Sequence, residues 1–149
     1  MDDHEAMARA LVLADAAGRA GDVPVGAVVL GPAAQLRGEG QNLREATADP
    51  TAHAEIIALR AAAASAGTWN LEGHTLVVTL EPCLMCAGAI LQARISRLVF
   101  GAWDDKAGAT GSMYDVLRDR RLPYRAEVVG GVQADAAAAL LQRFFDARR

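Results

Sequence analysis

The chain has 149 residues, of which 52% are hydrophobic, and this predicts one domain over residues 1–149 with enough apolar material for a single core. Its 15 Lys and Arg residues against 18 Asp and Glu residues give a formal net charge of −3 at pH 7, which excludes a strong hold on nucleic acid through overall charge and leaves only a local basic patch for such a contact. No stretch approaches the roughly 20 apolar residues of a membrane span, and the first residues lack the basic region of a secretory signal, so we expect a cytoplasmic protein without membrane contact.

The first part of the chain predicts a helix followed by a β-hairpin. Apolar residues recur at helical spacing over residues 3–20, which indicates an amphipathic helix. Residues 24–30 form an apolar run typical of a buried strand. Gly31-Pro32 is a turn signal, so residues 35–41 are expected to return beside that strand as its hairpin partner.

The middle of the chain predicts two helices and two strands. Asp49 can cap a helix over residues 50–67, which opens with a proline at the position where a missing N–H costs nothing. Residues 75–80 form a β-branched apolar run that predicts a strand, and a second helix is expected over residues 82–93. The next strand is predicted at residues 97–101, so the two strands should be parallel and joined by the helix.

The last third of the chain predicts a loop and three short or medium elements. Residues 101–112 are rich in glycine and charge and follow the carboxyl end of a strand, where open α/β sheets place their ligands. Beyond this loop we expect a short helix at residues 113–117, a strand at residues 125–129 and a closing helix at residues 135–148.

Two short motifs carry the chemistry of the chain. The first is His53-Ala54-Glu55, and the second, which begins 29 positions after the histidine (82 − 53 = 29), is Pro82-Cys83-Leu84-Met85-Cys86. Two cysteines three residues apart at a helix start face the same way, and alone they could be a redox or a buried pair. Together with His53 they supply three zinc ligands, and three is the number found in catalytic sites that leave the fourth position for water. The sequence therefore predicts one Zn²⁺ per chain.

The motifs and their flanks resemble a known family, the TadA-type bacterial tRNA adenosine deaminases. This resemblance implies a cytidine-deaminase-like α/β fold, a three-layer α/β/α domain with a five-stranded mixed sheet. It also implies hydrolytic deamination of adenosine to inosine at the wobble position (34) of a tRNA anticodon, a tRNA anticodon stem-loop as partner, and a homodimer. The resemblance rests on Asp49–Glu55, Thr79–Ala89 and Phe100–Ala102, with weaker similarity toward both ends of the chain.

The resemblance also implies roles for single residues. Glu55 would be the proton shuttle of the reaction. Without the resemblance, it would be read as an ordinary solvent-exposed carboxylate on a helix. Asn42 would contact the target nucleoside, although an asparagine after a strand is more often part of a turn. Asp104 would approach the ribose and backbone of the target nucleotide. Trp103 stands where relatives have a basic residue, so the RNA contact at this position is expected to differ.

The end of the chain offers the local basic patch that an acidic protein needs in order to contact nucleic acid. Arg143, Arg148 and Arg149 surround Phe144-Phe145, and this mixture suits flipped single-stranded RNA bases, whereas an ordinary solvated helix face is the alternative. Two other functions stay open from the sequence. One is a zinc deaminase of a free base or nucleotide such as guanine or cytosine on the same fold, and the other is a non-catalytic zinc or redox module.

Overall fold

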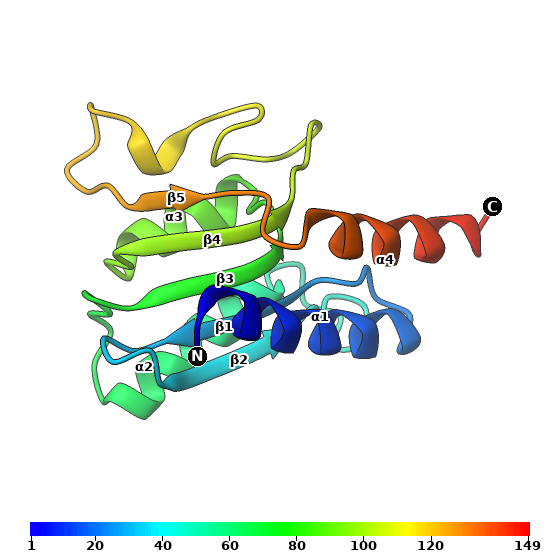
Figure 1. Ribbon diagram of the computed structural model, residues 1–149, viewed down its shortest axis with the longest axis horizontal. Helices are drawn as coiled ribbons and strands as arrows, with labels where there is room; N and C mark the ends of the chain where they lie inside the picture. The colour runs from blue at the N-terminus through cyan, green and yellow to red at the C-terminus, as the bar shows by residue number, and fades with distance from the viewer.

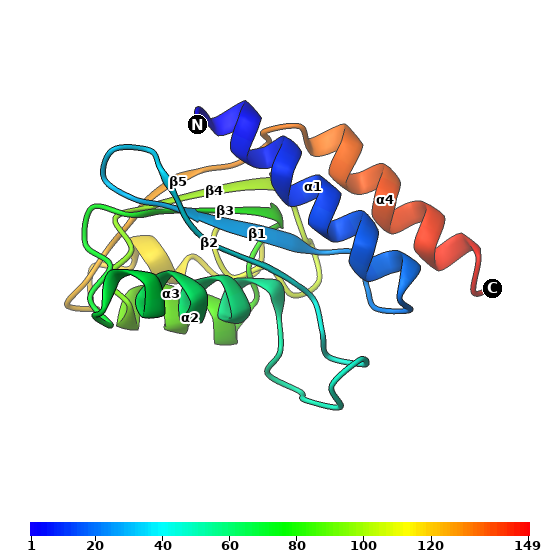
Figure 2. The same ribbon diagram turned by 90° about the horizontal axis from the view of Figure 1, so that it is seen from below.

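A five-stranded sheet with helices on both faces forms the body of the protein, as a computed structural model describes for residues 1–149 (Figures 1 and 2). Helices α1 and α4 lie side by side on one face of the sheet, and α2 and α3 cover the other face (Figure 2). None of these helices is long and apolar enough to cross a membrane. The helices are α1 (Asp3–Arg19), α2 (Ala54–Ala66), α3 (Leu84–Gln92) and α4 (Ala134–Asp146), with a 3₁₀ turn η1 (Val116–Arg118), and the strands are β1 (Gly26–Leu30), β2 (Leu36–Gln41), β3 (Thr75–Leu80), β4 (Arg97–Ala102) and β5 (Glu127–Val129).

The sheet is mixed, and its strands follow the order β2-β1-β3-β4-β5. Strand β1 is antiparallel to both β2 and β3, whereas β3, β4 and β5 are parallel to one another. The expected hairpin and the expected parallel strand–helix–strand unit are therefore both confirmed, and so is the three-layer α/β/α architecture. Because β3 and β4 are parallel, their carboxyl ends lie at the same edge of the sheet, where Glu81 and Trp103 follow them in the chain.

Each face of the sheet packs against its own helix layer. Alternate residues of a strand point to opposite faces, and so Leu76 and Phe100 belong to the core under α2 and α3, while Val77 and Val99 belong to the core under α1. Strands β1, β3 and β4 are almost wholly buried, which explains their continuous apolar sequences.

Helix α2 lies unusually close to the edge strand β2 because that strand presents glycines to it. A Cβ atom added at Gly38 would lie 2.6 Å from the backbone nitrogen of Ala62, and one added at Gly40 would lie 2.7 Å from the carbonyl oxygen of Ala54. No side chain fits in that space. The two glycines therefore set the distance between the sheet and the first turn of α2, which carries Glu55.

The prediction that a helix starts at Pro50 is wrong, because α2 begins at Ala54 with His53 as its N-cap residue. Asp49 does not cap a helix. Its carboxylate oxygen Oδ1 accepts hydrogen bonds from the backbone N–H and the hydroxyl of Thr51, both at 2.8 Å, and Ala48 before it has a left-handed backbone with φ of 51°. Residues 49–51 therefore form this local turn instead of the first turn of a helix.

Four smaller boundary predictions also need correction. Helix α3 begins at Leu84, so Cys83 is its N-cap residue and Pro82 lies outside it. The short helix expected at residues 113–117 is the 3₁₀ turn Val116–Arg118. Strand β5 covers only Glu127–Val129, because residues 125 and 126 do not pair with β4. Helix α4 starts one residue earlier than expected and ends at Asp146.

Candidate metal centre and active-site pocket

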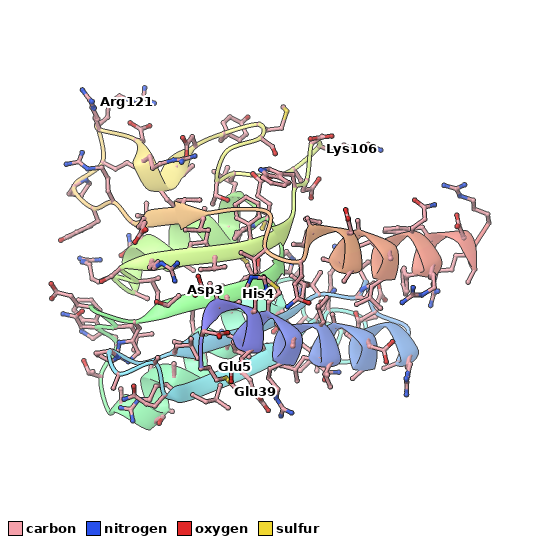
Figure 3. The ribbon with its side chains drawn as sticks, in the orientation of Figure 1. Asp3, His4, Glu5, Glu39, Lys106 and Arg121 are labelled. Atoms are coloured by element: carbon pink, nitrogen blue, oxygen red, sulfur yellow. The ribbon has the colours of Figure 1, made fainter.

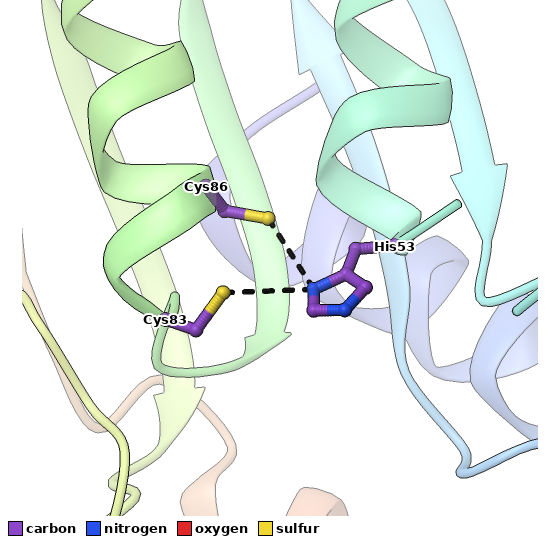
Figure 4. A group of neighbouring side chains, drawn as sticks. All are labelled: His53, Cys83 and Cys86. Carbon is purple, nitrogen blue, oxygen red and sulfur yellow. Dashed lines mark hydrogen bonds between the residues drawn. The ribbon is translucent and has the colours of Figure 1, made fainter. Parts of the chain in front are cut away.

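Three predicted zinc ligands meet at the start of two helices. His53 stands at the N-cap of α2, Cys83 at the N-cap of α3, and Cys86 in the first turn of α3. The Sγ atoms of Cys83 and Cys86 lie 3.6 and 3.5 Å from Nδ1 of His53 (Figure 4). The ligand atoms of all three residues lie within 4.8 Å of one another.

This spacing fits a tetrahedral zinc ion. Zinc–sulfur distances of about 2.3 Å and zinc–nitrogen distances of about 2.0–2.1 Å, at a tetrahedral angle, place sulfur and nitrogen about 3.6 Å apart. Both observed Sγ–Nδ1 distances agree with that value. The group contains one imidazole and two thiols and no carboxylate, which is a donor set that suits zinc and not a hard cation.

The three ligands perturb one another's proton affinities. A hydrogen bond from Cys86, together with one from His53, lowers the pKa of Cys83 to about 4 even though burial opposes this. The hydrogen bond to Cys83, together with burial, raises the pKa of Cys86, and the hydrogen bond to Cys83 raises the pKa of His53. The thiolate that a metal ion requires is therefore already favoured at Cys83.

Glu55 lies beside the metal group without belonging to it. Its side chain is almost fully buried, with 4% of the residue exposed, and burial raises the pKa of its carboxyl group. It lines the same cavity as His53. A buried carboxyl group with a raised pKa holds a proton more readily than an exposed one, which suits a residue that accepts a proton and returns it.

A cavity of about 580 Å³ opens beside the metal group, at the edge of the sheet where the carboxyl ends of β3 and β4 lie. Of the six site residues predicted from the sequence, five line it: Asn42, His53, Glu55, Cys83 and Asp104. The sixth, Cys86, is completely buried behind Cys83 in the first turn of α3. The structure thus brings all six predicted residues together. The cavity is also lined by residues for which the sequence predicted no contact with metal or substrate, namely Gly21, Asp22, Val23, Val25, Ala54, Arg44, Glu45, Leu80, Glu81 and Ala107.

Asn42 takes part in a turn and faces the cavity at the same time. Its side-chain oxygen accepts a hydrogen bond from the backbone N–H of Arg44 at 3.0 Å, and its amide nitrogen donates to the carbonyl oxygen of Val23 at 3.2 Å. The turn reading from the sequence is therefore correct. Because an amide nitrogen carries two hydrogens, the second N–H remains for a ligand in the cavity.

Glu81 organises the loop that carries Asp104. Its buried carboxylate accepts hydrogen bonds from the backbone N–H groups of Asp104, Thr110 and Ser112 and from the Ser112 hydroxyl. Burial opposes ionisation, but these hydrogen bonds outweigh it and lower the pKa of Glu81. These partners lie 23 to 31 positions away from Glu81 in the chain, so no local sequence pattern indicates them.

Of two further features of the pocket, the first, Asp22, had no clear signal in the sequence, whereas the second belongs to the basic patch that was predicted at the end of the chain. Asp22 is buried and accepts hydrogen bonds from the backbone N–H groups of Glu45 at 2.7 Å and Ala46 at 3.2 Å, so it holds the loop after β2 in place. On the other side, Phe144 of α4 and Arg148, two residues beyond the end of that helix, contribute to the cavity wall. The Arg148 guanidinium lies 3.5 Å from the centroid of the Phe144 ring, which joins a positive charge and an aromatic surface at the pocket.

Comparison with known proteins agrees with this site. Residues 1–102 match the family model described as cytidine and deoxycytidylate deaminase zinc-binding region. The chain is 50% identical, over 147 residues, to a tRNA-specific adenosine deaminase of Haemophilus influenzae, and the match covers 99% of this chain and 85% of that protein.

Solved structures share the fold. One, from a study of A-to-I editing by tRNA:A34 deaminases at the wobble position of transfer RNA, has a TM-score of 0.88 and 39% identity and covers 92% of this chain and 99% of its own. A guanine deaminase from Nitrosomonas europaea has a TM-score of 0.79 and 30% identity, with 95% of this chain and 83% of that chain covered. The zinc-binding region, the near full-length identity and the shared fold together place this chain in the family of the tRNA-specific adenosine deaminases, which are zinc-dependent enzymes of the cytidine and deoxycytidylate deaminase group.

Proposed function

We propose that this protein hydrolyses adenosine to inosine at the wobble position of a tRNA anticodon. The observation that carries this proposal is the combination of a His-Cys-Cys metal group and a buried carboxyl group in one cavity. The 50% identity to the Haemophilus influenzae enzyme over nearly the whole chain supports adenosine in tRNA as the substrate.

In this proposal His53, Cys83 and Cys86 hold one zinc ion. Zinc bound there acts as a Lewis acid that makes water nucleophilic at neutral pH. Glu55 moves the protons: its carboxylate would take one from the attacking water and deliver it to the purine ring nitrogen, and it would then carry the proton of the added hydroxyl group to the departing amine. Water adds at the purine carbon and ammonia leaves, so adenosine and water become inosine and ammonia.

The remaining residues of the cavity are proposed to orient the nucleotide. The free N–H of Asn42 can donate to the nucleoside, and Asp104, held at the cavity wall by Glu81, can approach the ribose. Phe144 of α4 and Arg148, just beyond that helix, offer an aromatic surface and a positive charge to RNA beyond the target nucleotide.

Assembly and location follow from the same proposal. We infer a homodimer whose RNA ligand touches both subunits, because α3 exposes Leu84 and Met85, two large apolar side chains, directly beside the metal group. A tRNA-modifying enzyme would work in the cytoplasm, where its substrate is. We also propose that residues 1–149 act as one domain, because the cavity is built from segments from Gly21 to Arg148.

A panel of substrates tests the function. The purified zinc protein is incubated with anticodon stem-loops that carry adenosine at position 34, and separately with free adenosine, cytidine and guanine, and both ammonia and inosine are measured. We expect turnover of the stem-loop far above that of any free compound. Guanine deamination without stem-loop turnover would support the second candidate, a free-base deaminase, which the fold shared with the Nitrosomonas europaea enzyme favours.

A further inference from the structure

We propose that Trp103 is a stacking surface for the base of a nucleotide that adjoins the target adenosine. This inference rests on the proposed function, since it requires an RNA strand that enters and leaves the cavity. Trp103 immediately follows β4 and precedes Asp104, which lines the cavity. It is 54% exposed, whereas Ala102 before it is buried.

The indole ring is held rigidly along one edge. Residues 130–133 connect β5 to α4, and a Cβ added at Gly131 would lie 2.7 Å from Cη2 of Trp103, while one added at Gly130 would lie 3.1 Å from its Cζ2. Gly131 also has a φ of 90°, in the left-handed region that favours glycine. The absence of side chains at these two positions leaves the space that the ring occupies.

The surroundings of the ring are fixed by other contacts. Phe100 packs against Trp103 edge to face, with ring centroids 5.6 Å apart and an angle of 88° between the planes. Gly131 and Val132 donate backbone hydrogen bonds to the carbonyl oxygens of Gly101 and Phe100. The ring is therefore preorganised, so little conformational entropy is lost when a ligand stacks on it.

The chemistry of the expected ligand decides what would cover this ring. A nucleotide that reacts in the cavity remains linked to its neighbours, and these must leave past the residues that flank the cavity wall. Unstacked bases in single-stranded loops regain stacking on aromatic side chains in proteins. Trp103 is an exposed aromatic surface one residue from Asp104 and does not itself line the cavity, so a base that stacks on it would lie outside the cavity that takes the target nucleoside. Trp103 would therefore determine selectivity for RNA and not the rate of the reaction.

The chain offers a matched control in its only other tryptophan. Trp69 is 63% exposed and lies beside the guanidinium of Arg94, 5.3 Å from the ring centroid. It follows the end of α2, and His53 precedes the start of that helix, so the 13-residue helix separates it from the cavity by about 20 Å.

Kinetics on two substrates form the first test. We expect Trp103→Leu to raise the KM for an anticodon stem-loop by about 5- to 150-fold, which corresponds to the loss of one stacked base, with kcat and the rate on free adenosine unchanged. Trp103→Phe should recover most of the loss, and Trp69→Leu should change little. An unchanged KM for Trp103→Leu, or an equal loss in Trp69→Leu, would overturn the proposal.

A binding experiment locates the base. Trp69→Phe combined with Glu55→Gln leaves Trp103 as the only tryptophan and prevents turnover, and its emission is followed as stem-loop is added. We expect quenching that disappears when one nucleotide next to position 34 is abasic. In a double-mutant cycle, the losses of binding free energy caused by that abasic site and by Trp103→Leu should not be additive.

Three outcomes separate the two proposals. If the losses of binding free energy from Trp103→Leu and from an abasic site are additive at every position next to 34, while the wild type turns over the stem-loop normally, only the proposed role of Trp103 is overturned. A change of oligomeric state in Trp103→Leu with unchanged RNA binding would also overturn it, since the ring would then be a protein contact. If the wild type neither binds nor deaminates the stem-loop, the proposed function itself fails, and the stacking role fails with it.

Discussion

The carboxylate of Glu81 accepts a hydrogen bond at 3.0 Å from the backbone N–H of Asp104, so a buried charge just after β3 holds Asp104, the second residue after β4, at the cavity wall. In Glu81→Gln one acceptor oxygen becomes an NH₂ group that faces N–H donors. We expect a loss of about 1–3 kcal/mol in the free energy of unfolding and a raised KM for the stem-loop, with zinc retained. Denaturant unfolding and metal analysis measure these effects. The exposed Glu72→Gln is the control, and equal stability of the two variants would contradict the expectation.

The metal ligands are tested by metal content. We expect about one zinc per chain after dialysis in the wild type, and none in the Cys83→Ala, Cys86→Ala double variant, because these residues and His53 form the cluster that fits zinc. His74→Ala is the matched control, since His74 lies outside the cluster and its ring nitrogen contacts the carbonyl oxygen of Glu72 at 3.2 Å. Retention of zinc by the double variant would disprove the ligand assignment.

Proton transfer is tested at Glu55. Glu55→Gln should keep zinc and fold, because the residue is not part of the metal cluster, and should lower kcat by about 10²–10⁴-fold, the usual contribution of a general acid–base group. Glu45→Gln, an exposed carboxylate at the same cavity, should keep most of the activity. A normal rate in Glu55→Gln would mean that another group moves the protons.

Helix–sheet spacing is tested at Gly40. A methyl group there would lie 2.7 Å from the carbonyl oxygen of Ala54, so Gly40→Ala should push the first turn of α2 away from β2 and move His53 and Glu55. We expect weaker zinc retention and lower activity together with a loss of roughly 1–3 kcal/mol in unfolding free energy, as for other overpacked sites. Gly88→Ala is the control, because a Cβ at that helix position meets open space. Unchanged zinc affinity in Gly40→Ala would show that the packing of α2 against β2 does not position the metal site.

The pH dependence of stability is tested at Asp3, which pairs with Arg97 at 2.7 Å and ties α1 to β4. The hydrogen bond from Arg97 lowers the pKa of Asp3 below its ordinary value of 3.8. A depressed folded-state pKa means that the stabilisation is fully present above that ordinary value and is lost as the pH falls through the folded one. Asp3→Asn should therefore be less stable than wild type at pH 7, by up to about 1 kcal/mol, and the gap should close below about pH 3.8. Asp15→Asn, on the same helix, is the control for loss of a carboxylate from a more exposed ion pair, the one that Asp15 makes with Arg19.

The sequence was enough for the elements and residues whose causes are local. The apolar run at residues 75–80 forms β3 with those bounds, because a buried strand needs no partner information to be recognised. The two motifs supplied the metal cluster, since the donor types restrict the metal and its geometry. The resemblance to the TadA-type family named the remaining site residues, and all of them lie at the cavity.

Other features could not be predicted, either because two local structures compete for the same residues or because the contacting residues lie far apart in the chain. Pro50 and Asp49 form a good helix start in isolation, and only the turn made with Thr51 shows why α2 begins later. The carboxylate of Asp22 meets the backbone of Glu45 across 23 positions, and no local pattern announces such a contact. The same holds for the Trp103 ring against Gly131, where each residue alone is unremarkable.

His53 and Cys83 both occupy N-cap positions, and neither side chain accepts a hydrogen bond from its own helix. Serine, asparagine or aspartate at such a position stabilises a helix by about 1 kcal/mol relative to a residue that does not cap. The protein therefore gives up folding stability at two positions that we propose hold the metal ion, a trade between stability and activity. A metal-free chain with His53→Asn or Cys83→Ser should be harder to unfold than the metal-free wild type and yet catalytically dead. Selection for thermal stability alone would thus favour substitutions at these two N-cap positions, and such substitutions would remove the catalytic activity.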